Sequence, residues 1–250
     1  MPFSARRCAF DEIAEMRDAY RAEMNCQVIH DSLHARPGWS EEYALELDAS
    51  LAGYGSVAVG GPWRESAAPY EFYVLPEHRS RIFEAFETLL AACRPPKIET
   101  QTNDQMLSTM LHTYSREIEA EAILFGDGFA TSHQIPGARV RRRTAADVEE
   151  LMRLELDEGA GWVLEVGGQL AGAGGVLFHY NRPYGDVYMK IAESFRRRGL
   201  GTYLVQELKA ACREGGSVPA ARCNVRNEAS RRTLQKAGFV PCGNLISGKL

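Results

Sequence analysis

Hydrophobic and polar positions along the chain form two series that follow the same order. Apolar residues three and four apart predict an amphipathic helix at 11–24 and another at 145–157. Two short apolar segments separated by a turn follow each helix and predict a β-hairpin in each half. The order helix, hairpin, strand, helix, strand, helix, strand thus occurs twice. It predicts an α/β fold of the α+β kind with mixed sheets.

The elements after the first hairpin are expected at 71–75, 79–93, 97–102, 104–116 and 121–125. Those after the second hairpin are expected at 187–192, 199–214, 220–225, 227–237 and 239–242.

Sequence similarity between the two hairpins supports a duplication. Leu51–Val57 and Leu170–Val176 agree at five of seven positions, at an offset of 119 residues. A segment rich in glycine, serine and threonine, 126–138, separates the two series and has the composition of a linker. We therefore predict two domains, 1–137 and 138–250. A single domain with chance similarity is the alternative.

Charge is distributed unevenly between the two halves, although the whole chain has a net charge of only −4. Residues 1–138 hold 11 Lys and Arg against 21 Asp and Glu, whereas residues 139–250 hold 18 against 12. The basic second half predicts a polyanionic ligand. No array of aromatic residues accompanies the basic ones, which favours a phosphate-bearing cofactor over nucleic acid.

Targeting and metal-binding signals are absent from the sequence. No apolar run approaches the roughly 20 residues needed to span a bilayer, and the N-terminus has no apolar core typical of a signal peptide. No cysteine cluster has metal-ligand spacing, and His30 and His34, which are four residues apart, have no evident third ligand. We therefore expect a cytoplasmic protein that uses neither a membrane nor a metal.

A basic turn follows the strand expected at 187–192. Arg196–Arg198 precede Gly199, and Gly201 lies in the first turn of the next helix. The first N–H groups of a helix have no intrahelical partner and lie at its positive end. Glycine lets a phosphate approach these groups, and arginine adds charge and forked donors. The segment therefore predicts a phosphate-binding turn.

This turn resembles the R-x-x-G-x-G signature of the GNAT superfamily, the acyl-CoA-dependent N-acyltransferases. Arg196, Gly199 and Gly201 stand in its three defining places. A second segment, Asn227–Phe239, is similar to the family's N-x-x-(S/A)…K-x-G-F ending. Two motifs at the family's spacing make the resemblance specific.

The resemblance implies that the second domain binds acetyl-CoA and transfers its acetyl group to a primary amine. It also implies that a backbone N–H near Ile191 stabilises the oxyanion, with pantetheine along the same strand edge. The implied cofactor-binding residues are Met189, Lys190, Ile191, Arg196, Arg197, Arg198, Gly199, Leu200, Gly201, Thr202, Asn227 and Ser230.

Catalytic residues are less well defined by the resemblance. Candidate bases are Asp186, Glu165 and His179. The strands that carry Asp186 and Glu165 border the acceptor cleft in relatives. Strand-end charges that face solvent are the alternative interpretation. Many relatives carry a tyrosine acid seven residues after the asparagine, and that position is Leu234 here. Either Tyr188 or another group serves instead, or the thiolate leaves without help.

The first half departs from the motif at the glycines. When the strand ends are aligned, Arg79 takes the place of the turn's first arginine, Ile82 that of its first glycine and Glu84 that of its second. The branched side chain would block the approach of a diphosphate, and the carboxylate would repel it. We therefore predict a degenerate first copy without a CoA site, an arrangement that resembles two-copy members of the family.

Several alternatives remain open at the level of sequence. The second half could be a non-catalytic acyl-CoA sensor, or it could transfer a longer acyl group if Gly172, Gly174 and Gly175 leave room for one. The first half could be a dimerisation surface, giving a homodimer. The acceptor is expected to be a small-molecule or peptide amine.

Overall fold

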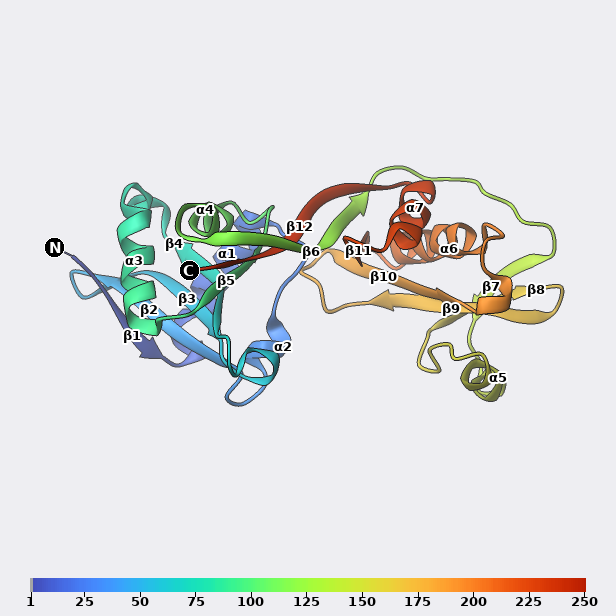
Figure 1. Cartoon of the computed structure of the whole chain (residues 1–250), viewed down its shortest axis with the longest axis horizontal. Coiled ribbons are helices and arrows are strands. Elements are labelled where there is room, and N and C mark those ends of the chain that lie inside the picture. The colour runs from blue at the N-terminus through green and yellow to red at the C-terminus, as the bar shows by residue number, and fades with distance from the viewer. Residues whose placement is uncertain (1) are drawn as a thin grey trace. The chain divides into compact units, whose positions relative to one another are not determined.

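The computed structural model describes residues 2–250, which form two compact units (Figure 1). Unit 1 comprises the residues up to Ala122 together with Gly243–Leu250, and unit 2 comprises Ile123–Cys242. One sheet has the strand order β1-β2-β3-β4, and the other has the order β5-β12-β6-β11-β10-β9-β8-β7. Helices accompany both sheets, so the predicted mixed α/β fold is confirmed.

Unit 1 contains β1 (Phe3–Cys8), α1 (Phe10–Met24), α2 (Asp31–His34), β2 (Ser40–Leu47), β3 (Ser50–Ala58), η1 (Gly61–Trp63), β4 (Ala68–Val74), η2 (Pro76–Arg81), α3 (Ile82–Cys93), β5 (Lys97–Gln101) and α4 (Gln105–Tyr114). Unit 2 contains β7 (Ala138–Arg142), η3 (Ala145–Asp147), α5 (Val148–Arg153), β8 (Trp162–Val166), β9 (Gln169–Leu177), β10 (Tyr184–Ile191), η4 (Glu193–Phe195), α6 (Leu200–Glu214), β11 (Val218–Asn224) and α7 (Glu228–Lys236). Two strands, β6 (Arg116–Asp127) and β12 (Phe239–Lys249), each begin in one unit and end in the other.

Each unit has its own hydrophobic core. In unit 1, Ile13 of α1, Phe86 of α3 and Leu107 of α4 are fully buried in one cluster with the apolar residues of β2, β3 and β4. In unit 2, α6 and α7 lie on one face of the sheet and α5 on the other (Figure 1). The leucines of α6 at 204 and 208 are fully buried against that face, as their spacing of four residues requires.

Unit 1 also encloses a buried ion pair. The guanidinium of Arg17 donates to both carboxylate oxygens of Glu71, each at 2.8 Å, and the two side chains are almost completely buried. Tyr54 donates to the same carboxylate at 3.2 Å. His34 lies between Glu71, 3.3 Å from its Nε2, and Glu42, 2.9 Å from its Nδ1. Burial alone would raise the pKa of Glu71, but hydrogen bonds from His34 and Arg17 lower it to about 2.

The two hairpins have the same register at the offset of 119 residues. The pairing of Ala44 with Tyr54 in unit 1 has its counterpart in the pairing of Val163 with Ala173 in unit 2. Both hairpins contain a register shift. It lies between Leu45 and Glu46 in unit 1 and between Leu164 and Glu165 in unit 2, again 119 residues apart. The similarity seen in the sequence therefore extends to the backbone.

Glycines at equivalent positions bring a helix close to each hairpin. A Cβ atom at Gly55 of β3 would lie 2.3 Å from Leu89 of α3. A Cβ atom at Gly174 of β9 would lie 3.0 Å from Leu208 of α6. Both the glycines and the leucines are 119 residues apart. The same close approach of helix to strand is thus repeated in the two units.

The sequence pattern did not predict two strands, β1 ahead of α1 and β7 ahead of α5. β1 pairs antiparallel with β2, and β7 pairs antiparallel with β8. Each contains two consecutive arginines, Arg6–Arg7 in β1 and Arg141–Arg142 in β7, and therefore lacks the apolar run by which strands are recognised.

The division between units differs from the boundary expected between 137 and 138, because the expected linker packs on unit 2. Lys209 of α6 is buried, and its Nζ donates to the carbonyl oxygens of Phe129 at 3.0 Å and Ala237 at 2.9 Å. Gln206 of the same helix donates to the carbonyl oxygen of His133 at 3.1 Å. These contacts hold the segment along α6.

The end of the chain also departs from the expected domain 138–250. β12 was expected to end at Cys242 but continues to Lys249. Its residues Leu245–Lys249 pair antiparallel with β5, so the end of the strand lies in unit 1, next to the edge strand of the eight-stranded sheet. Pro241 and Gly243 interrupt the apolar pattern there, which explains why the strand was predicted too short.

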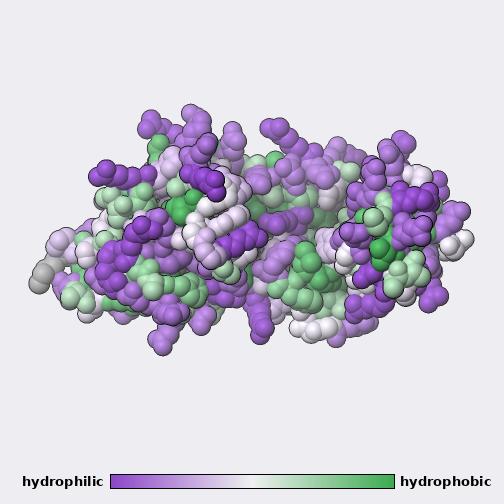
Figure 2. Space-filling model, turned by 90° about the horizontal axis from the view of Figure 1, so that it is seen from below, coloured by the Kyte–Doolittle hydropathy of each residue, from purple (hydrophilic) through white to green (hydrophobic). Residues whose placement is uncertain are grey.

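The surface is ordinary for a folded protein. The face shown in Figure 2 is mostly hydrophilic, with hydrophobic residues in small groups. None of the helices within residues 2–250 is both long and apolar enough to cross a membrane. In the same part of the chain, no three His, Cys, Asp or Glu side chains gather closely enough to hold a metal ion.

Candidate functional site

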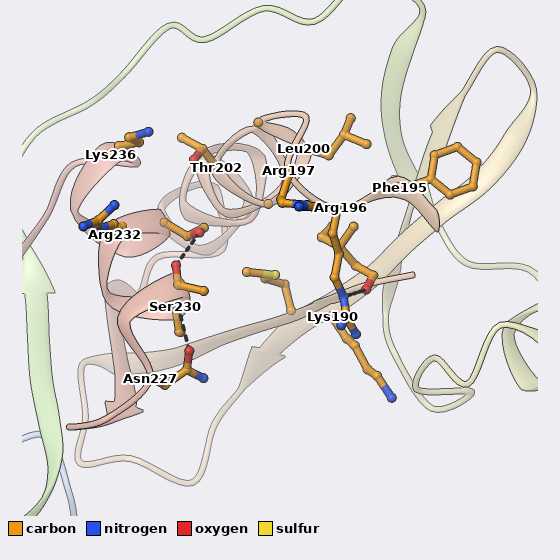
Figure 3. Close-up of a pocket in the computed structure, with 16 residues that line it drawn as sticks. Lys190, Phe195, Arg196, Arg197, Leu200, Thr202, Asn227, Ser230, Arg232 and Lys236 are labelled. Carbon is orange, nitrogen blue, oxygen red and sulfur yellow. Dashed lines mark hydrogen bonds between the residues drawn. The ribbon is translucent and has the colours of Figure 1, made fainter. Parts of the chain in front are cut away.

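A cavity of about 510 Å³ opens at the N-terminus of α6 in unit 2 (Figure 3). It lies between the end of β10, the basic turn that follows, the first turn of α6 and one face of α7. We call it the α6 cavity. Its lining residues are Met189, Lys190, Ile191, Phe195, Arg196, Arg197, Gly199, Leu200, Gly201, Thr202, Asn227, Ala229, Ser230, Arg232, Thr233 and Lys236.

The backbone of the turn leaves the start of α6 open. Gly199 is the N-cap of α6 with φ 78°, and Arg197 also has a positive φ, 63°. No side chain caps the helix, so the first N–H groups remain available at its positive end. Gly201 is needed for a different reason, since a Cβ atom there would lie only 3.2 Å from Met189 and Thr233.

The three arginines of the turn have different roles. Arg196 donates from Nε to the carbonyl oxygen of Ile191 at 3.2 Å, which closes the turn onto β10. Arg197 lines the α6 cavity. Arg198 donates to the carbonyl oxygen of Ser194 at 3.0 Å and does not line the cavity.

Cations line the α6 cavity from two sides, and no carboxylate is among its lining residues within the described chain. Figure 3 shows Arg196 and Arg197 on the turn and Arg232 and Lys236 on α7, across the cavity from them. Lys190, the fifth cation, extends away and donates to a backbone carbonyl in the loop after α5. Such a cavity favours a polyanion.

The start of α7 is held by its own cap. The side-chain oxygen of Asn227 accepts a hydrogen bond from the backbone N–H of Ser230 at 3.0 Å (Figure 3). Both residues line the cavity. Asn227 therefore fixes the helix that carries Arg232 and Lys236, whatever further contact it makes.

The structure brings together eleven of the twelve residues that the sequence indicated for cofactor binding, the exception being Arg198. The lining residues that the sequence analysis missed are Phe195, Ala229, Arg232, Thr233 and Lys236. Four of these lie on α7 at 229, 232, 233 and 236, which is one face of a helix. That spacing, counted from the capping asparagine, is the signal that could have found them.

A second hollow, of about 210 Å³, lies where β10 and β11 separate. The parallel pairing of these strands ends at Asp186 and Ala220, although β10 continues to Ile191 and β11 to Asn224. We call this space the fork hollow. It shares Met189 with the α6 cavity, and the separation frees one backbone edge of β10 between the two hollows.

Asp186 and Tyr188 both line the fork hollow. Burial raises the pKa of Asp186, and the Nε2 atom of His179 lies 3.0 Å from its carboxylate. Tyr188 donates to Asp157 at 2.7 Å, and burial raises the pKa of the phenol. Leu234, in the place of the expected tyrosine, is buried at the same hollow. The structure therefore brings Asp186 and Tyr188 together at this hollow, with His179 in contact with Asp186.

Glu165 lies elsewhere in unit 2. Its carboxylate accepts from Arg141 at 2.6 Å, and Arg141 also pairs with Asp147 at 2.7 Å. These three side chains line a separate hollow of about 580 Å³. Glu165 is thus engaged in an ion pair and is not among the residues lining the fork hollow.

The glycines of β9 do not leave room for a longer acyl group. A Cβ atom at Gly172 would lie 2.6 Å from Ile191, and one at Gly174 would lie 2.4 Å from the carbonyl oxygen of Tyr188. At Gly175 the Tyr188 ring would be 3.1 Å away. Neighbouring atoms already occupy the space, so the interpretation of these glycines as an acyl pocket is wrong.

The turn before α3 in unit 1 keeps the bond from arginine to the preceding strand but does not leave the helix N-terminus open to an anion. Arg79 donates from Nε to the carbonyl oxygen of Val74 at 3.0 Å, the same bond that Arg196 makes to Ile191. Its other nitrogens donate to both carboxylate oxygens of Glu23 at 2.5 Å. The guanidinium that would face a phosphate is therefore neutralised.

A carboxylate occupies the start of α3 in unit 1. Glu84 pairs with Arg81 at 2.6 Å and accepts the backbone N–H of Phe3 at 3.3 Å. Arg81 is the N-cap of α3, the position that Gly199 holds in α6, and Ile82 begins the helix. A negative charge at this helix end opposes an anion, whereas unit 2 has glycine there.

The segment that carries both hollows resembles a known family. Residues 129–239 match the family model described as the acetyltransferase (GNAT) family. This match includes the basic turn, α6 and α7. It supports the GNAT resemblance drawn from the two motifs, and acetyl-CoA-dependent N-acetyl transfer is the general activity of that family.

Solved structures of GNAT proteins share the fold of the chain. An acetyltransferase of the GNAT family from Colwellia psychrerythraea has 13% identity and a TM-score of 0.76, with 99% of each chain covered. A GCN5-related N-acetyltransferase from Sphaerobacter thermophilus has 12% identity and a TM-score of 0.61, covering 99% of this chain and 95% of that one. A tandem GNAT protein from the clavulanic acid biosynthesis pathway has 13% identity and a TM-score of 0.58, covering 98% and 97%. A comparison with curated proteins finds no match.

Proposed function

We propose that unit 2 is an N-acetyltransferase that moves the acetyl group of acetyl-CoA to a primary amine of a small molecule or peptide. One observation carries this proposal. Cations flank the α6 cavity from two elements, no carboxylate of residues 2–250 lines it, and it opens onto an uncapped helix N-terminus built with two glycines. A ligand with several phosphates satisfies all three features.

The residues present fit coenzyme A group by group. The free N–H groups at the start of α6, with Arg196 and Arg197, suit the diphosphate. The edge of β10 beyond Asp186, left unpaired by β11, offers N–H and C=O groups to the pantetheine amides. The fork hollow then lies where a thioester would arrive.

The chemistry falls to residues at the fork hollow, because the thioester supplies an acetyl group that is already activated. A backbone N–H of β10, expected near Ile191, stabilises the oxyanion. Asp186 accepts the amine proton, since burial brings its pKa nearer to neutrality. Tyr188 lines the same hollow and would protonate the thiolate once its hydrogen bond to Asp157 is released. Glu165 is bound to Arg141 outside this hollow, so we assign the base to Asp186.

We propose further that unit 1 is a degenerate copy of unit 2. The shared hairpin register, the repeated contact between glycine and leucine, and the equivalent bonds of Arg79 and Arg196 support a duplication. The tandem GNAT neighbour has the same general arrangement. Because Glu23 and Glu84 neutralise the unit 1 turn, it is proposed to bind no coenzyme.

Titration calorimetry tests both parts of this proposal. Acetyl-CoA added to the full chain is expected to bind at one site per chain. Two sites would contradict the degenerate role of unit 1, and no binding would contradict the function proposed for unit 2. Release of free thiol from acetyl-CoA with spermidine, benzylamine or an unblocked tetrapeptide is expected to exceed release without amine. Binding without release would instead indicate an acyl-CoA sensor.

Removing the α7 cations is expected to weaken the binding of acetyl-CoA more than the binding of 3′-dephospho-acetyl-CoA. The double variant Arg232→Ala/Lys236→Ala removes charges that lie across the α6 cavity from the diphosphate turn. A hydrogen bond to a charged group contributes about 1.5–3 kcal/mol, so a loss of about tenfold to hundredfold is expected for acetyl-CoA. Calorimetry with both coenzymes measures the difference. The control Arg153→Ala/Arg226→Ala removes the same charge outside the cavity, and an equal loss in the control would contradict the assignment.

A further inference from the structure

A histidine outside the coenzyme cavity contacts the buried carboxylate of the fork hollow. His179 lies in the loop between β9 and β10, and Asp186 is the last residue of β10 that pairs with β11. The Nε2 atom of His179 is 3.0 Å from Oδ2 of Asp186. The carboxylate side chain is only 9% exposed, whereas the imidazole is 47% exposed. The pair thus connects the fork hollow to the surface.

Neighbouring groups hold the pair in place. The ring of Tyr180, itself buried, packs edge-on against the imidazole with centroids 5.0 Å apart. Arg222 of β11 lines the fork hollow beside Asp186, and its positive charge lowers the pKa of that carboxyl while burial raises it. The charged and titratable groups that act most strongly on Asp186 are His179, Tyr180 and Arg222.

A buried carboxylate that accepts a proton needs a way to release it. An amine that attacks a thioester loses one proton for each acetyl group transferred, and that proton must leave before the next cycle. Asp186 itself has little access to water. The half-exposed imidazole beside it does have access, and its geometry allows a direct transfer.

We propose that Asp186 and His179 form a proton relay from the fork hollow to solvent. This inference rests on the function proposed above. The attacking nitrogen forms its bond to the acetyl carbon as the bond from that carbon to sulfur breaks, and its proton passes to the carboxylate of Asp186. The leaving thiolate takes a proton from Tyr188, which regains one from water. His179 takes the proton at Nε2 and releases it to water, which restores both groups. Asp186 is then a catalytic residue, and His179 acts through it.

Chemical rescue tests the relay. His179→Ala is expected to lower kcat for amine acetylation about tenfold to hundredfold, with the Kd for acetyl-CoA unchanged, because proton transfer contributes about 10²–10⁴-fold in enzymes. Added imidazole is expected to restore a large part of the lost rate, since the site is at the surface. Asp186→Asn is expected to lose at least as much activity and to gain nothing from imidazole. His112→Ala, an exposed histidine of unit 1, is the control and should behave as wild type.

The outcomes separate the relay from the proposed function. A wild-type protein that binds no acetyl-CoA, or releases no thiol with the amines above, overturns the function and the relay with it. A wild-type protein that acetylates amines while His179→Ala keeps its full rate overturns the relay alone. A loss of kcat without rescue by imidazole also overturns it, because a histidine that only supports the loop would behave in that way.

Discussion

Replacing Gly201 by glutamate is expected to weaken the binding of acetyl-CoA by unit 2 about a thousandfold. The new carboxylate would stand in the first turn of α6, inside a cavity whose other charges are all positive. Two like charges about 4 Å apart repel by about 4 kcal/mol at the effective dielectric of a protein surface. That energy corresponds to a rise in Kd of about a thousandfold, which titration calorimetry can measure.

Two milder variants separate charge from shape at this helix end. Gly201→Ala places only a methyl group 3.2 Å from the flexible end of Met189, so a loss of less than about tenfold is expected. Gly199→Ala meets open space, with only Ile135 at 3.6 Å, but forces a side chain into φ 78°. Its cost of about 1–2 kcal/mol should appear as lost thermal stability of the turn. If Gly201→Glu binds acetyl-CoA as tightly as Gly201→Ala, the diphosphate does not lie here.

The second large effect is expected from Arg17→Met in unit 1. This variant leaves the carboxylate of Glu71 buried without its guanidinium, and breaking a buried pair in this way costs about 3–5 kcal/mol. A fall of about 10 °C or more in the melting temperature of the unit is expected by calorimetry. The double variant Arg17→Met/Glu71→Leu should recover much of the loss, because no charge then remains unpaired.

The same variant should change the response to acid. The folded-state pKa of Glu71 is about 2, below its ordinary value of 4.5. The carboxylate therefore contributes stability above pH 4.5, and this contribution is lost as the pH falls toward 2. Without Arg17 the pKa rises and the loss begins at higher pH. Arg6→Met, which removes an exposed arginine paired with Glu46, is the control and should change the melting temperature little. Equal effects of the two variants would contradict the assigned role of the buried pair.

Local signals explain why much of unit 2 could be predicted from the sequence. The basic turn depends on glycine conformation, on a helix N-terminus and on nearby arginines, all within seven residues. The hairpins depend on alternation and short turns, and their register repeats at the offset seen in the sequence. The strands β1 and β7 escaped prediction because consecutive arginines mask their alternation, and Arg232 was missed because helix packing decides which face of α7 meets the cavity.

By itself, the sequence determined the order of most helices and strands, the repeated hairpin and the basic turn, since each is encoded within one short segment. Tertiary structure alone decided the separation of β10 from β11, the contact of His179 with Asp186, the burial of Arg17 against Glu71 and the return of the last strand to β5. These features join residues from different elements, up to about 150 positions apart. Their energies come from burial and pairing, which depend on how the elements pack.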